Sequence, residues 1–422
     1  MIVKPKSWPY LVSIVIILAL LIITQAPTVN VLIILNCLIG IVTVLSAKVS
    51  LLSLWSLVSN YTYLNVVHYY FASNGYGLLA LTDKSSLHIL EMSKYLLILN
   101  LSLLFWSMFT MFSSREDDLL KTYSFEALEK NNSRQFINFA CLVAIACSII
   151  EFPRLPFTSV SSAARFATLL PGTGWNHLAL IAMLFLLPSL KHSKQVKWTY
   201  IFVIFWFLSH GERVDMIGFL ILLLFLYLKN HKITISTLIK SIVVALIIFL
   251  VFSYIGERRG GADNITLGSL FEKLFKQNTA SDVGYVFNIS CDYIKKYPLT
   301  HGKLLIFYLE QIIPDLAIPS VQNCGDIFLG ARYAYPGGAY ILTEPLLYFG
   351  VLGVFIIPNV YLGLIYMFLK NKRQYKFYVY IFLGATVLRY VWYGMEYIET
   401  ALVWFIPFFY YLYHKRVKVK FS

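Results

Sequence analysis

Long apolar blocks, separated by short polar stretches, alternate along most of this chain. Blocks such as "YLVSIVIILALLIIT" (10–24) and "SIVVALIIFLVFSYI" (241–255) contain almost no polar residues. About 20 such residues in a helix span a bilayer. A surface helix of a soluble protein would instead carry one polar face. The pattern therefore predicts an all-α, polytopic integral membrane protein.

About twelve transmembrane helices are expected in one transmembrane domain that covers residues 1–422. One large outer loop, residues 257–343, separates the ninth from the tenth. The predicted spans are residues 8–25, 29–47, 50–72, 95–113, 136–152, 174–190, 198–210, 214–228, 236–256, 344–369, 377–394 and 400–413.

The outer loop has an amphipathic character of its own. "LGSLFEKLFKQ" and "SDVGYVFNISCDYIKKYP" predict short amphipathic helices. "GKLLIFYLEQIIPDLAIP" is too apolar for free solution and too short to span a bilayer. The loop is therefore expected to associate with the membrane as a lid and to have no independent fold.

Basic residues fix the orientation. With the N-terminus inside and the spans alternating, the cytoplasmic side receives 21 Lys and Arg against 5 acids, and the outer side 14 against 16. This asymmetry is typical of membrane topology. Both termini are expected in the cytoplasm, and the net charge of +14 gives no support to nucleic-acid binding. Only 13% of residues are charged, about half the share in a soluble domain.

Five cysteines are spread thinly, and no Cys or His spacing resembles a metal site. Cys291 and Cys324 share the outer loop, where an oxidising compartment would permit a disulfide. Whether the two are bonded is left open by the sequence.

The tripeptide Gly-Glu-Arg occurs twice on the outer face, at residues 211–213 and 256–258. The hairpin around the first copy has only about sixteen residues per arm, so Arg213 is expected at the depth of a lipid phosphate. Arg258 and Arg259 precede glycines that free the backbone to wrap an anion. A charged turn, in which Arg213 pairs with Glu212 or Asp215, is the alternative.

Other outer residues are candidates for phosphate binding or proton transfer. Arg165 and Arg332 lie among aromatic, apolar and hydroxyl residues, where Arg can bind phosphate oxygens bidentately. Glu344 starts a helix after "YPGGAY", as a general base or only a helix cap. His301, in "YPLTHGK", is a second possible base. Arg389 and Glu396 could form a plain ion pair.

Three segments together resemble the bacterial O-antigen (oligosaccharide repeat unit) polymerases of the Wzy type. They are "GERVDMIGFLILLL", "YIKKYPLTHGKLLIFYLEQIIP" and "PGGAYILTEPLLYFGVLG", within about residues 205–370. Relatives often have Asn where this chain has Tyr348, and a small residue where it has Val214. The resemblance implies a fold similar to the GT-C-like membrane glycosyltransferases and an enzyme that works without a metal or other cofactor.

The resemblance also implies a reaction and its setting. At the periplasmic face of the inner membrane, undecaprenyl-diphosphate-linked repeat units would be polymerised in lipopolysaccharide or related polysaccharide synthesis. Glu344 and His301 would then be catalytic, and Arg213, Arg258, Arg259, Arg165 and Arg332 would bind diphosphate or glycan. Expected partners are this lipid-linked oligosaccharide, membrane lipids and a chain-length regulator and flippase of the pathway. Alternatives are an O-antigen ligase and, in another class, a flippase of lipid-linked oligosaccharide.

Overall fold

The computed structural model describes residues 28–72, 77–108, 111–123, 128, 132–156, 169–170, 174–210, 214–230, 235–259, 265–272, 278–299, 328–370, 373–394 and 396–418. This part of the chain is mostly helical and contains no strand, as the apolar blocks predict. The first predicted span, residues 8–25, lies outside it.

Helices cover the other predicted ranges closely. In chain order they are α2 (Val29–Ala47), α3 (Leu51–Phe71), α4 (Ile89–Met108), α5 (Met111–Thr122), α7 (Arg134–Glu151), α9 (Trp175–Leu186), α10 (Lys194–Ser209), α11 (Val214–Asn230), α12 (Ile235–Arg259), α13 (Leu267–Glu272), α14 (Asn278–Lys296), α17 (Thr343–Leu369), α18 (Gln374–Ala385), α19 (Val387–Tyr393), α20 (Glu396–Thr400) and α21 (Ile406–Lys418). Short helical turns add η1 (Gly77–Leu81), η2 (Lys84–Ser86), η3 (Leu187–Ser189) and the π-helical η4 (Ala401–Phe405).

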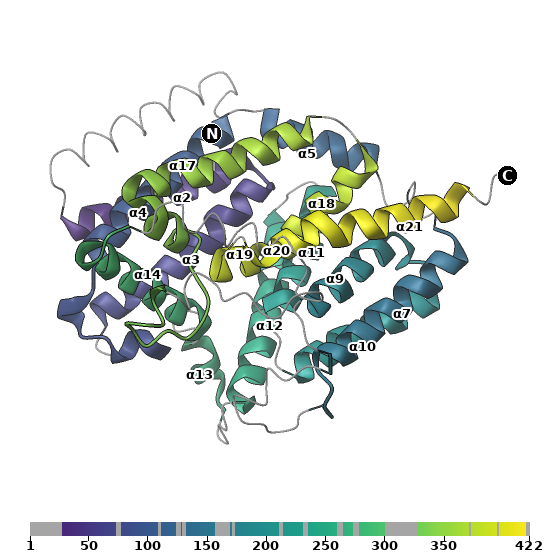
Figure 1. Ribbon diagram of the computed structural model, residues 1–422, viewed down its shortest axis with the longest axis horizontal. Coiled ribbons are helices and arrows are strands. Elements are labelled where there is room, and N and C mark those ends of the chain that lie inside the picture. The colour runs from purple at the N-terminus through teal and green to yellow at the C-terminus, as the bar shows by residue number, and fades with distance from the viewer. Residues whose placement is uncertain are drawn as a thin grey trace.

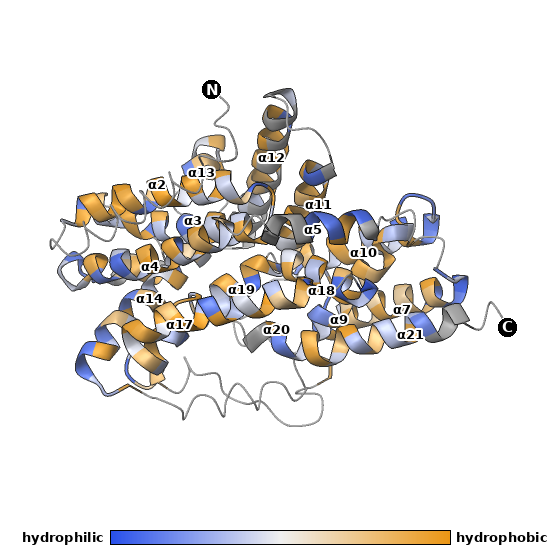
Figure 2. Ribbon diagram, turned by 90° about the horizontal axis from the view of Figure 1, so that it is seen from above, coloured by the Kyte–Doolittle hydropathy of each residue, from blue (hydrophilic) through white to orange (hydrophobic). Residues whose placement is uncertain are grey.

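Four described helices, α2, α4, α7 and α17, are long and apolar enough to cross a membrane. Figure 2 shows hydrophobic residues dominating α2 and α17. Large apolar side chains stay exposed on both, including Ile34 on α2 and Leu352 on α17. Such surfaces suit contact with lipid, because water would leave them unfavourably solvated.

One predicted span is interrupted: the range 377–394 is divided between α18 and α19 at Thr386. The range 95–113 contains α4 and the start of α5, and residues 109–110 lie outside the described residues. Within α17, Gly350 has φ +60° and ψ −141°, so the helix is broken there. After the break the chain folds so tightly that a Cβ on Gly353 would lie 1.9 Å from the Pro345 carbonyl oxygen. Glycine at both positions permits this reversal.

The helices form two groups joined through the centre of the molecule (Figure 1). At one end α2, α3, α4, α14 and α17 lie together, and at the other α7, α9, α10 and α21. Helices α11, α18 and α19 connect them. A Cβ on Gly218 of α11 would lie 2.0 Å from the Ala385 carbonyl oxygen, so α11 contacts the end of α18 backbone to backbone. Small residues allow such approaches between membrane helices.

The prediction of helices in the outer loop is confirmed in part. Helix α14 forms, and α13 covers the described part of "LGSLFEKLFKQ", of which residues 273–277 lie outside the described residues. The apolar face of α14 packs into the helical body against α3, α4 and α17, with Val286 and Cys291 fully buried. Helix α14 is thus part of the core. Cys291 is a free thiol there, and Cys324 lies outside the described residues.

Polar contacts between connecting segments fall into two groups. Lys229 binds Glu116 at 3.1 Å, and Gln374 donates to the Tyr413 hydroxyl at 3.1 Å, both among segments expected inside. The outer segments likewise contact each other: the Leu78 amide donates to Asp282 at 2.8 Å, and His88 lies 3.2 Å from Asp292. None of these contacts joins a predicted inner segment to an outer one.

Candidate functional site

Glu344 lies in the first turn of α17, where a glycine-rich turn delivers it. Gly337 and Gly338 have φ of +83° and +84°, which glycine adopts readily. The following residues run along α19: the Ala339 amide donates to the Trp392 carbonyl at 3.1 Å, and the Ile341 amide to the Val391 carbonyl at 3.0 Å. The N-cap of α17 is Leu342, which makes no side-chain cap hydrogen bond. Glu344 itself is buried, with 4% of its surface exposed.

The Glu344 carboxylate lies against Gly394, where α19 ends. Gly394 has φ +102°, and a Cβ there would lie 2.7 Å from Glu344 Oε1. Any larger residue would therefore be strained and would also displace the carboxylate. The "PGGAY" turn and the Gly394 break, which are far apart in sequence, together hold this side chain.

A second carboxyl group, Glu399 of α20, lies close enough to Glu344 for the charge of Glu344 to affect it. Burial, with a smaller contribution from the nearby charge of Glu344, raises the pKa of Glu399 to about 8. Glu399 stands just outside the last predicted span and is half-buried. Its Oε2 is buried and has no hydrogen-bond partner in the described part of the chain. At neutral pH Glu399 is therefore largely protonated.

Glu344 also lines a small cavity between α3 and α17. The other lining residues are Trp55, Ile341, Pro345, Ile357, Pro358 and Tyr361. The indole of Trp55 donates to the Tyr390 hydroxyl of α19, which fixes the ring. Acid and aromatic side chains thus meet in an enclosed, mostly apolar space, where a carboxylate can serve as a proton acceptor.

A buried ion pair joins α19 to α11. Arg389 donates to both oxygens of Asp215, from Nε to Oδ1 at 3.0 Å and from Nη2 to Oδ2 at 2.7 Å. Asn176 donates to Asp215 Oδ2 at 2.8 Å. The predicted pairing of Arg389 with Glu396 stays a prediction, because the Glu396 side chain lies outside the description. The Asp215 carboxylate comes from α11, a helix distant in sequence from α19.

His210 next to the first Gly-Glu-Arg copy has a structural role. Its ring stacks on Phe152 with centroids 5.3 Å apart, and Nε2 lies 2.9 Å from the Arg154 carbonyl oxygen. Nδ1 lies 2.7 Å from the Trp206 carbonyl oxygen. Both ring nitrogens thus contact backbone, and the side chain is half-buried.

The predicted arginines are only partly described. Arg332 is exposed, with its guanidinium carbon 4.5 Å from the Tyr297 ring centroid. Arg258 and Arg259 end α12, and their side chains lie outside the description. Arg213, Arg165 and His301 lie outside the described residues. Leu299, two residues before His301, is 3.5 Å from the position of a Cβ on Gly350.

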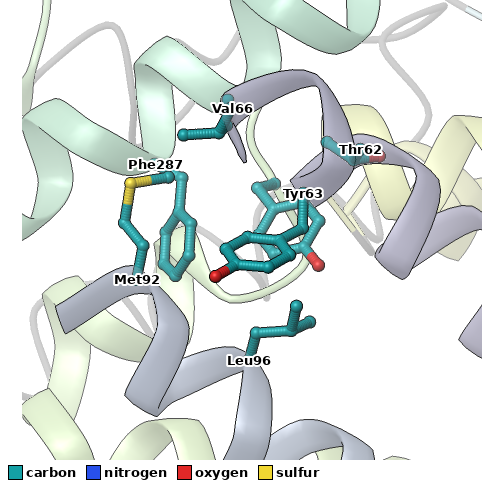
Figure 3. Close-up of a pocket in the computed structure, with 8 residues that line it drawn as sticks. Thr62, Tyr63, Val66, Met92, Leu96 and Phe287 are labelled. Atoms are coloured by element: carbon teal, nitrogen blue, oxygen red, sulfur yellow. The ribbon is translucent and has the colours of Figure 1, made fainter. Parts of the chain in front are cut away.

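A second small cavity lies between α3, α4 and α14 (Figure 3). It is lined by Thr62, Tyr63, Val66, Met92, Leu96, Gly284, Phe287 and Tyr340. Its two tyrosine hydroxyls are engaged, Tyr63 with Ser93 and Tyr340 with the Ser59 carbonyl at 3.1 Å. This cavity is an apolar space under α14 and holds none of the candidate acids.

Among the described residues, no three His, Cys, Asp or Glu side chains gather in a group able to hold a metal ion. Glu399 and Asp215 are the functional candidates that sequence reasoning did not select. The only sequence signal for Glu399 is an acid next to the apolar run "TALVWF", and nothing there indicates that it meets Glu344.

Comparison with protein-family models, with curated proteins and with solved structures finds no match to this chain.

Proposed function

We propose that the protein is a membrane glycosyltransferase that polymerises oligosaccharide repeat units carried on undecaprenyl diphosphate. The observation that carries the proposal is Glu344, a buried carboxylate in a cavity, held by two glycine-dependent turns beside a second acid. Such a group suits general-base catalysis, because a carboxylate in an enclosed site can accept the proton of a bound hydroxyl.

The proposed reaction is a glycosyl transfer without a covalent intermediate. The hydroxyl of an acceptor repeat unit attacks the anomeric carbon of the donor glycan. The bond from that carbon to the diphosphate oxygen breaks, and undecaprenyl diphosphate leaves as the anion. The hydroxyl proton goes to Glu344, with His301 as the second candidate base. No metal or other cofactor is included in this scheme.

Arginines would stabilise the diphosphate. Arg213 and Arg258 are assigned to donor and acceptor diphosphates or to two sides of one, with Arg259, Arg165 and Arg332 as further contacts. The buried Arg389–Asp215 pair supports the role of Arg213, since Asp215 already has a guanidinium partner on both oxygens. That contact weakens the alternative in which Arg213 only pairs with Asp215.

The proposal includes twelve spans, a GT-C-like arrangement, an inner-membrane location and cytoplasmic termini. The separation of inner from outer polar contacts supports alternation of the spans. The excess of basic residues on one side supports the orientation.

A flippase of the same lipid-linked oligosaccharide is the second candidate from another class. The breaks at Gly350 and Gly394 favour it, because discontinuous helices are typical of secondary transporters. A ligase that passes finished glycan to the lipid A core is the alternative within the glycosyltransferases.

Surface glycan from cells that lack the protein separates these functions. A missing polymerase leaves glycan of a single repeat unit, a missing flippase leaves none, and a missing ligase leaves polymer on the undecaprenyl carrier. We expect the single-unit pattern, restored to a full ladder by the wild-type gene.

Glu344→Gln should also give the single-unit pattern, with roughly a 100-fold or greater loss of chain extension, since the amide has no basicity. The exposed outer residue Glu272 provides the control, and Glu272→Gln should give a normal ladder. A normal ladder in Glu344→Gln, with the protein present in the membrane, would exclude Glu344 as the base.

A further inference from the structure

Helix α19 lies at the centre of the molecule, where it contacts both α3 and α11 (Figure 1). Arg389 of α19 binds both oxygens of Asp215 in α11. The hydroxyl of the next residue, Tyr390, accepts a hydrogen bond from the indole of Trp55 in α3. Neighbouring residues of one short helix therefore bind two other helices that are distant in sequence.

The same helix supports the segment that leads to Glu344. The Trp392 carbonyl of α19 accepts from the Ala339 amide at 3.1 Å, and the Val391 carbonyl accepts from the Ile341 amide at 3.0 Å. Residues 339–341 are thus held along α19 by their backbone. This segment continues directly into the first turn of α17, where Glu344 lies.

The Glu344 carboxylate and its cavity both depend on where α19 lies. Gly394 directly follows α19, and a Cβ there would lie 2.7 Å from Glu344 Oε1. Trp55 and Ile341, which both bind α19, line the cavity together with Glu344. A rotation of α19 would therefore move the carboxylate and two residues of the cavity wall.

The Asp215–Arg389 pair fixes α19 in direction as well as in place. Its two hydrogen bonds run side by side, at 3.0 Å and 2.7 Å, and a bidentate contact of this kind holds the plane of the guanidinium. Asn176 of α9 donates to the same carboxylate at 2.8 Å. The guanidinium carbon also lies 4.9 Å from the centroid of the Tyr393 ring, at the end of α19.

We propose that Asp215 and Arg389 are positioning residues: their bidentate pair holds α19 in the orientation that places Glu344 and its cavity wall for proton transfer. This inference rests on the proposed transferase function. Both residues act through α19 and contact none of the reacting atoms in the proposed scheme. A displacement of about 1 Å at a reacting group can cost roughly 100-fold in rate, so the orientation of α19 matters for the reaction.

Hydrogen exchange at the Ala339 and Ile341 amides tests the anchoring of α19 without any substrate. The variant is Asp215→Leu with Arg389→Met, because apolar side chains can replace a buried ion pair at little cost in stability. In the full-length protein in lipid nanodiscs, we expect both amides to exchange about 10-fold faster, since the helix that accepts from them is no longer fixed. The Leu78 amide, which donates to Asp282, is the reference and should exchange as in the wild type.

Kinetics with undecaprenyl-diphosphate-linked repeat units test whether this anchoring affects the reaction. In the double variant kcat should fall roughly 10- to 100-fold while KM stays within about twofold, because misplacing a reacting group slows the chemical step and leaves substrate binding intact. Arg389→Lys keeps the charge opposite Asp215 but lacks the planar fork, so its kcat should lie between the two. Lys296→Met, at the exposed Asp292 pair, is the matched control and should behave as the wild type.

The possible results separate positioning from stability. A wild-type kcat in a stably folded double variant overturns the inference, because the pair would then only stabilise the fold. Unchanged exchange at Ala339 and Ile341 also overturns it, because α19 would then be held without the pair. If the double variant does not reach the membrane, wild-type kcat and exchange in Arg389→Lys overturn it equally.

Failure of the proposed function would give a different result. If Glu344→Gln extends chains normally, or if the wild-type protein transfers no glycan from the lipid carrier, the transferase proposal is overturned. The exchange measurement needs no substrate, so it still decides whether the Asp215–Arg389 pair anchors α19.

Discussion

The Asp215–Arg389 pair is the clearest residue-level constraint outside the Glu344 site. Asp215 is fully buried and accepts from Arg389 and Asn176, so its charge is neutralised by a bidentate contact. The pair joins α11 to α19, and Gly394 at the end of α19 contacts Glu344. Buried pairs of this kind contribute little beyond an apolar replacement, but leaving one partner alone is costly.

Arg389→Met should therefore lower the free energy of unfolding by about 3–5 kcal/mol, because Asp215 is left as an unpaired buried charge. The double variant Asp215→Leu with Arg389→Met should recover much of that loss. Thermal unfolding of the solubilised protein is the measurement, and Lys296→Met at the exposed Asp292 pair is the control, with little change expected. If the double variant were as unstable as Arg389→Met, the unpaired Asp215 charge would not be the cause of the destabilisation.

Contacts between helices depend on asparagine side chains and on glycines. Asn100 of α4 binds both Asn36 of α2 and Asn60 of α3 at 3.0–3.1 Å, which fixes the relative register of the three helices. Helix α14 is held differently. A Cβ on its Gly284 would lie 2.6 Å from Val66 Cγ2 of α3, beside the apolar cavity.

Gly284→Ala should loosen α14 from α3 and reduce stability by about 1–3 kcal/mol, the usual cost of overpacking. Gly268→Ala in α13 is the matched control, since the nearest atom to its Cβ would be 3.8 Å away. We expect the control to be neutral or slightly stabilising, because alanine favours helix over glycine. Equal melting temperatures for the two variants would show that α14 does not contact α3 this closely.

At the scale of the whole molecule, the described polar contacts form two sets, one among predicted inner segments and one among predicted outer segments. Lys229 with Glu116 belongs to one set, and the Leu78 amide with Asp282 to the other. Both sets join segments that are far apart in sequence. The arrangement suits a membrane protein whose connecting segments alternate between two aqueous faces.

Cysteine labelling from the outside of intact cells should reach Ser85→Cys and Lys296→Cys and miss Asp118→Cys. All three positions are exposed, so differences in labelling report sidedness and not burial. Ala280 is unsuitable despite its place in the outer loop, because it is fully buried in α14. Labelling of Asp118→Cys by an impermeant reagent would contradict the proposed orientation.

Sequence alone determined the helical class and most helix positions. Apolar blocks of fixed length must form helices in a bilayer, since every backbone polar group there needs a partner within its own segment. Helix α2, Val29–Ala47, has the predicted bounds. Helices α10 and α11 are as short as the arms predicted for the hairpin around Arg213. The place of Glu344 in the first turn of a helix was also readable, from Pro345 and the glycines before it.

Only the tertiary structure decided which polar residues meet. The sequence did not indicate that Asp215 binds Arg389, which lies 174 residues away along the chain. It gave no reason to connect Glu344 with Glu399, or to bury α14. A long-range contact between polar groups leaves no periodic trace in the chain, because it depends on how helices cross and where glycines such as Gly350 and Gly394 break them.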